Sequence, residues 1–103
     1  MRLDLHPEAR AELRSAALWY EERRPGLGDE LVTEVFAAFV RIRDHPESYG
    51  RWPGTRDRAL IRRCPIERFP YVVAFQRHGE SVLVLAIAHA KRRPLYWLTR
   101  VTV

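Results

Sequence analysis

The sequence feature that most constrains the fold is an apolar run near the C-terminal end, from Val82 to Ala88. Polar and apolar residues do not alternate in this run, so a strand formed by it presents apolar side chains on both faces of a sheet. Such a strand is usually covered on both sides. Two amphipathic helices earlier in the chain can cover one face. The other face is covered either by a tail around Leu95, Tyr96 and Trp97 that folds back across the sheet, or by a partner chain.

Two helices are predicted upstream of this strand. Proline and an acidic residue within His6–Glu8 favour a helix start, and the helical pattern continues to about Glu22. A turn rich in proline and glycine, Arg24–Gly28, then ends the first helix. The second helix opens at Asp29 or at the glycine before it. It ends by His45, because the proline that follows disfavours the helical conformation of the residue before it.

Both helices are predicted to be amphipathic and to form an antiparallel hairpin, because their connection is short. Their apolar residues recur at helical spacing, so they lie on one face of each helix. These residues are Leu13, Ala16, Ala17 and Tyr20 in the first helix, and Val32, Val35, Phe36, Phe39 and Ile42 in the second. The charged residues of the helices are expected to be solvated surface. On the first helix these are Arg10, Glu12, Arg14, Glu21 and Glu22.

Three further strands are predicted from short apolar and β-branched runs. Leu3–Leu5 alternates and can form a first strand. Ala59–Arg63 and Val72–Arg77 form the next two, and a tight turn at His78–Gly79 leads into the last strand. Residues 46–57 contain several proline, glycine and aromatic residues, and are predicted to be a loop.

These elements predict a single α+β domain over residues 1–103, with the order β-αα-βββ. The helical hairpin packs on one face of a small, mostly antiparallel sheet. The segment Cys64–Glu67 lengthens the connection between the second and third strands, and the register of those strands depends on how it is accommodated.

Composition narrows the classes of partner. The net charge of +5 and a pI near 10.1 indicate an anionic partner, either nucleic acid or an acidic protein. Almost all of the positive charge is arginine, which binds phosphate or carboxylate bidentately but is a poor proton donor at ordinary pH. Cys64 is the single cysteine, so no intramolecular disulfide forms, which fits a reducing cytoplasm. No export signal and no membrane-spanning run is predicted.

No metal or cofactor site is predicted. The four histidines include no pair at the i,i+4 spacing of metal ligands, and a cysteine-rich zinc site is excluded. The two glycines Gly26 and Gly28 lack the preceding strand and the third glycine of a dinucleotide-binding loop, so they are interpreted as a turn between helices.

Three segments carry a resemblance to a known family. They are Trp19–Gly28, then Phe69–Tyr71, and finally the basic and aromatic tail His89–Trp97. In this order, and in a chain of this length, they resemble the RelE/ParE family of bacterial toxins from type II toxin–antitoxin pairs. The resemblance extends from about Leu3 to Trp97. It implies a toxin that a cognate antitoxin neutralises in a tight complex, with a toxin–antitoxin hetero-oligomer as one outcome.

The family includes two activities, and fold alone does not choose between them. The sequence Trp-Tyr-Glu-Glu-Arg followed by Gly-Leu-Gly looks more like the ParE side, whose members lack an RNase centre and are associated with DNA gyrase. The preferred prediction is therefore inhibition of gyrase in the cytoplasm. The first alternative is RelE-like, ribosome-dependent cleavage of mRNA, and the second is a non-toxic family member that only binds its partner.

On the RNase alternative, proton transfer falls to His89 or Tyr96, since His89 is the well-placed group with an ordinary pKa near neutrality. Arginines on the sheet would stabilise the phosphate, with Arg62 and Arg77 as the clamp. Alternation places Arg62 and Arg63 on opposite faces, so only one of them shares a surface with Arg77.

The tail supplies the remaining candidates. Lys91, Arg92 and Arg93 are adjacent cations predicted to contact DNA, RNA or an acidic antitoxin. On the gyrase hypothesis, the sheet arginines Arg62, Arg63 and Arg77 are candidates for the same target or antitoxin contacts. The predicted partner-binding residues are Leu95, Tyr96 and Trp97, and Tyr96 is also placed to stack on a base.

Overall fold

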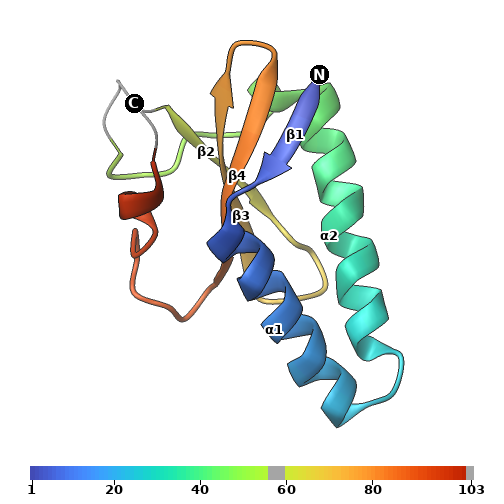
Figure 1. Cartoon of the computed structure of the whole chain (residues 1–103). Coiled ribbons are helices and arrows are strands. Elements are labelled where there is room, and N and C mark those ends of the chain that lie inside the picture. Colours follow the sequence, from blue (N-terminus) through green and yellow to red (C-terminus); the bar gives the residue numbers. More distant parts are fainter. Residues whose placement is uncertain (56–59, 102–103) are drawn as a thin grey trace.

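The computed structural model describes residues 1–55 and 60–101 and has the predicted α+β fold, in which two helices pack against a four-stranded sheet (Figure 1). The helices and strands follow the predicted order, with a short 3-10 turn after the second helix and another near the C-terminus. The elements are β1 (Arg2–Leu5), α1 (Pro7–Arg23), α2 (Leu27–Asp44), η1 (Pro46–Ser48), β2 (Ile61–Pro65), β3 (Tyr71–His78), β4 (Ser81–His89) and η2 (Leu98–Arg100).

The sheet has the strand order β1-β4-β3-β2, so the apolar strand β4 lies between β1 and β3. β1 runs parallel to β4, while the β3–β4 and β2–β3 pairs are antiparallel, which confirms the mostly antiparallel sheet. The short run at the N-terminus is thus a true strand, paired with the strand most distant from it in sequence. This long-range pairing brings the start of α1 beside β4.

The two faces of β4 belong to two separate apolar clusters. Val82, Val84 and Ile87 pack with the helices, whereas Leu85 and Ala86 both lie in the cluster on the outer face. Two neighbours reach the same face because the register shifts at this point: Ala86 pairs with Ala74, and Val84 pairs with Phe75. The shift is a β-bulge, which leaves the extra residue unpaired and bends the strand.

The tail of the chain covers the outer face. Trp97 is completely buried there, and its ring meets the ring of Trp52 edge to face with centroids 5.0 Å apart. Leu85, Ala86 and Ile61 form the floor beneath these rings. Of the two alternatives for covering β4, the chain therefore uses its own tail (Figure 1, red segment).

Several predicted boundaries and faces are wrong. Phe36 is 52% exposed, so the stripe of α2 is rotated, and Leu31 and Ala38 are in the core instead. The segment predicted as a plain loop begins with the 3-10 turn η1. β2 extends to Pro65, which fixes its register against β3. The predicted strand residue Ala59 and loop residue Asp57 lie outside the described residues.

The predicted turn between the helices is confirmed, and it has a cap that the sequence analysis missed. Gly26 adopts a left-handed conformation, with φ of 90°, immediately before α2. The Glu21 carboxylate accepts hydrogen bonds from the backbone N–H groups of Gly26 and Gly28, at 2.8 and 3.0 Å. These bonds satisfy donors at the start of α2 that have no partner within the helix. Glu21 therefore joins the two helices: it is exposed, as predicted, but its role as a cap was not predicted.

Replacing Gly28 with alanine is expected to lower the free energy of unfolding by about 1–3 kcal/mol, because overpacking a tight contact forces backbone shifts. A Cβ atom at this position would lie 2.4 Å from the backbone oxygen of Ala17, too close for any real contact. Urea unfolding of the purified chain measures the change. Gly50→Ala is the matched control, since a Cβ there meets nothing within 4 Å. An equal effect in the two variants would contradict the close helix contact.

Candidate functional site

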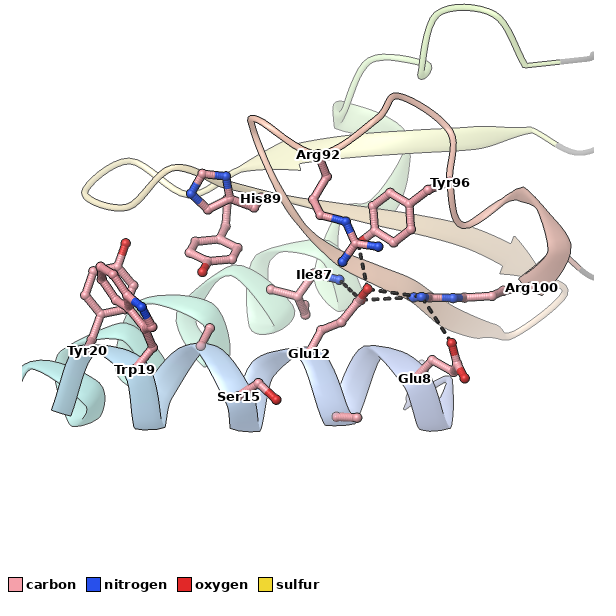
Figure 2. Close-up of a pocket in the computed structure, with 13 residues that line it drawn as sticks. Glu8, Glu12, Ser15, Trp19, Tyr20, Ile87, His89, Arg92, Tyr96 and Arg100 are labelled. Atoms are coloured by element: carbon pink, nitrogen blue, oxygen red, sulfur yellow. Dashed lines mark hydrogen bonds and ion pairs between the residues drawn. The ribbon is translucent and has the colours of Figure 1, made fainter. Parts of the chain in front are cut away.

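A groove of about 720 Å³ lies between α1 and the C-terminal part of the chain (Figure 2). Its α1 side follows the helix from Glu8 to Tyr20, and the end of β4 and the tail form its opposite side. The residues that line it are Glu8, Ala11, Glu12, Ser15, Ala16, Trp19, Tyr20, Tyr71, Ile87, His89, Arg92, Tyr96 and Arg100.

One end of the groove is aromatic. Trp19 is 50% exposed and stands edge to face against Tyr20, with ring centroids 4.9 Å apart. Across the groove, the rings of Tyr71 and His89 meet at 5.1 Å. The guanidinium of Arg23 lies 3.5 Å from the centroid of the Trp19 ring and holds the indole in place by a cation–π contact. This end presents rigid aromatic area, which is the kind of surface that anchors protein partners.

The other end of the groove is a polar network centred on Glu12. Its carboxylate forms a bidentate ion pair with the Arg100 guanidinium, with oxygen–nitrogen distances of 2.9 and 3.1 Å. It also accepts hydrogen bonds from the Tyr96 hydroxyl at 2.6 Å and from the Ile87 backbone N–H at 3.0 Å (Figure 2). Arg100 additionally donates to the Leu85 carbonyl at 3.0 Å. The network fastens the tail to α1 and to β4 at the bulge.

Glu12 was predicted to be solvated surface, and that prediction was wrong. Its side chain is only 16% exposed and that of Arg100 only 10%. A carboxylate this buried is stable only when it is paired and fully hydrogen-bonded. Nothing in the local pattern of α1 distinguishes Glu12 from its exposed neighbours, because its partners come from the opposite end of the chain.

The two residues proposed for proton transfer have different surroundings. Burial, reinforced by the hydrogen bond to Glu12, raises the pKa of Tyr96 well above its ordinary value. Tyr96 is therefore protonated at neutral pH and its proton is directed at a carboxylate, which leaves it no capacity to act as a base. The Nδ1 atom of His89 accepts a hydrogen bond from the Lys91 backbone N–H at 3.0 Å, and its ring borders the groove.

The sheet arginines lie where strand alternation predicted. Arg62 faces the helix side, opposite Phe75, and donates to the Tyr49 carbonyl at 2.6 Å. Arg77 lies on the same face and is paired with Glu47. Arg63 lies on the outer face, with its guanidinium 5.4 Å from the Trp52 ring centroid.

The structure does not bring Arg62 and Arg77 together with the proposed proton-transfer residues. Arg77 is beside the β3–β4 turn, opposite Val82, whereas His89 is at the far end of the same hairpin, opposite Tyr71. An RNA phosphate held by Arg77 would therefore lie a full strand length from His89.

The basic tail is exposed and close to the groove. Among the ion pairs of the described residues, none involves Lys91, Arg92 or Arg93. Arg92 stacks on the Tyr96 ring, 3.9 Å from its centroid, and borders the groove. Of the predicted partner-binding residues Leu95, Tyr96 and Trp97, the first two are half-buried and Trp97 is completely buried.

Comparison with known proteins identifies the family. Residues 3–94 match the family described as the ParE toxin of type II toxin–antitoxin system, parDE. The chain belongs to the ParE toxin family. The ParE match covers the helical hairpin and all of the sheet except Arg2, and it ends just before the tail segment that carries Tyr96, Trp97 and Arg100.

A solved structure supports the ParE fold. The chain is similar to a structure titled "Chromosomal ParDE TA system from P. aeruginosa", with a TM-score of 0.65 and 18% sequence identity over 88% of this chain and 97% of that one. No curated protein sequence gives a significant match. Among the described residues of this ParE-family chain, no helix is long and apolar enough to cross a membrane, and no cluster of side chains could hold a metal ion.

Proposed function

We propose that this ParE-family chain is the toxin of a toxin–antitoxin pair, that it acts in the cytoplasm on DNA gyrase, and that a cognate antitoxin neutralises it by direct binding. The observation that carries the proposal is the ParE family match over residues 3–94. The chain would act as an inhibitor rather than as an enzyme.

The groove along α1 supports the antitoxin part of the proposal. From Glu8 to Tyr20 it follows α1 for about 18 Å, at 1.5 Å per residue, which is room for a short helix or strand of a partner. Partner helices often lay an apolar face into such a groove, and the aromatic end around Trp19 offers anchoring area. The net charge of +5 favours fast association with an acidic antitoxin.

Three features of the site support an inhibitor over an RNase. Arg62 and Arg77 lie away from the groove, and Tyr96 is committed to Glu12 as a donor. His89 borders the groove without an arginine clamp from the sheet beside it. RelE-like cleavage therefore remains the second candidate, resting on His89.

Induction of this chain alone in bacteria tests the target. Thymidine and amino-acid incorporation are followed side by side during the first minutes, and early loss of DNA synthesis with continuing translation is the expected result. Early collapse of translation would favour RNA cleavage, and His89→Ala would then be the variant to examine. If neither process falls, the chain is not a toxin. Co-induction of an acidic protein encoded beside it is expected to restore growth.

A further inference from the structure

A second cavity, of about 330 Å³, lies on the outer face of the sheet and is separate from the groove along α1. It is lined by the start of β3, the end of β4, the tail, and the segment before β2. Its lining residues are Trp52, Pro53, Arg63, Val72, Ala88, His89, Ala90, Arg92, Arg93, Pro94, Leu95, Tyr96 and Trp97. Its size is at the lower end of the range for small-molecule sites.

The cavity gathers positive charge without a matching negative charge. Arg63, Arg92 and Arg93 line it, and the described residues of its lining include no carboxylate. Two arginines elsewhere in the domain are paired with carboxylates: Arg68 with two glutamates, and Arg100 with Glu12 and another glutamate. Arg92 and Arg93 are exposed and Arg63 is half-buried, so water screens part of their mutual repulsion, and a bound anion would neutralise the rest.

Two of the lining residues also carry an unused hydrogen-bond donor. The Nε atom of Arg63 and the Nε1 atom of Trp97 are buried and have no hydrogen-bond partner. Trp97 as a whole is completely buried. An unpaired buried donor costs about 1–3 kcal/mol, so two of them on residues that line one cavity require an explanation. Both are N–H groups, and both require an acceptor.

We propose that this cavity binds a phosphate group, either free or carried on a nucleotide. Three guanidinium groups and an indole N–H supply more donors than the two oxygens of a carboxylate can accept. A phosphate offers three strong acceptor oxygens and up to two negative charges, which matches the guanidinium forks. The half-buried ring of Trp52 in the lining supplies aromatic surface on which a base can stack.

The phosphate site and the groove share one wall. Arg92 and Tyr96 border both cavities, and the Arg92 guanidinium is stacked on the Tyr96 ring. Because the ring is held by Glu12, the tail that forms the phosphate site is fixed from the groove side. Phosphate binding does not depend on whether the chain arrests growth, so it can be tested on the purified chain alone.

The test is a titration of the ¹⁵N-labelled full chain, read from the indole N–H signals of its three tryptophans. Inorganic phosphate is expected to shift the Trp97 signal, which is assigned from its loss in Trp97→Phe. The signal of Trp19, in the other cavity, is the internal control. Adenosine 5′-monophosphate binding more tightly than phosphate would identify a nucleotide as the source, and equal affinities would identify free phosphate. Glutamate binding as tightly as phosphate would overturn the assignment.

The variant Arg63→Gln distinguishes specific phosphate binding in the cavity from nonspecific electrostatic attraction to the whole chain. It removes one cation and one buried donor, and it is expected to weaken phosphate binding at least about tenfold, the usual effect of losing a hydrogen bond to a charged group. Arg14→Gln removes the same charge from the exposed face of α1 and is expected to leave affinity within about twofold, because exposed charges at a distance are screened. Equal losses in both variants, or no Trp97 shift at millimolar phosphate, would overturn the proposal.

Discussion

Trp97→Ala is expected to lower the free energy of unfolding by about 3–5 kcal/mol, the range measured when a buried large aromatic residue is removed. The indole is completely buried and is the largest side chain of the outer cluster. It covers Leu85 and Ala86 of the central strand and meets the Trp52 ring. Its loss leaves the outer face of β4 without cover, so the variant is also expected to bind a hydrophobic dye and to self-associate.

Urea unfolding and light scattering measure the two effects. Trp19→Ala is the control, because it removes the same side chain from a position that is 50% exposed, and is expected to cost about 1 kcal/mol or less. If both variants unfold at the same urea concentration and stay monomeric, the tail does not cover the sheet in solution. The outer face would then require a partner chain, which was the other alternative for the run Val82–Ala88.

The architecture could be predicted because its signals are local. The turn containing Gly26 and the proline at position 46 set the limits of the helices to within about two residues, the usual precision for such boundaries. The run Val82–Ala88 requires that both faces of its strand be covered, and this requirement does not depend on the conformations of the loops. The tail was one of two possible covers, and only its burial in the structure decides between them.

It was harder to predict which residues of a helix face the core. Phe36 fits the helical spacing of α2 as well as Leu31 does, yet it lies on the solvent side. Spacing alone cannot fix which of two adjacent stripes faces the sheet, since packing against α1 sets the rotation of α2. The close approach at Gly28, where no side chain fits, contributes to that rotation.

The polar sites were the least predictable part. Strand alternation correctly separated Arg62 from Arg63, because it is a geometric property of any strand. It gave no indication that Arg77 is paired with Glu47, or that Arg92 and Arg93 line a cavity with Arg63. Contacts between the tail and the rest of the chain depend on the folded path of the backbone, which no local pattern encodes.

Glu12 is the polar residue whose substitution best tests these contacts, because it joins α1 to the tail. Glu12→Gln is expected to lower the free energy of unfolding by about 3 kcal/mol, the lower end of the range for breaking a buried ion pair, since the side chain is 16% exposed. The substitution keeps the shape of the side chain but removes the buried counter-charge of Arg100, whose side chain is only 10% exposed. The only counter-charge that remains among the described residues is Glu8, which is 66% exposed. The tail, which this pair fastens to α1, is expected to loosen before the rest of the domain unfolds.

Urea unfolding measures the loss, and amide hydrogen exchange in residues 95–100 reports the loosening. Glu22→Gln is the matched control: it removes the same charge from the same helix at a side chain that is 75% exposed, where an ion pair contributes little. Tyr96→Phe removes a single hydrogen bond to the carboxylate and is expected to cost about 1–2 kcal/mol. Because both residues act on one network, the double variant is expected to lose less than the sum of the two single losses. Strict additivity would mean that Tyr96 and Glu12 are not coupled in solution, and the polar attachment of the tail to α1 would then rest on Arg100 rather than on Tyr96.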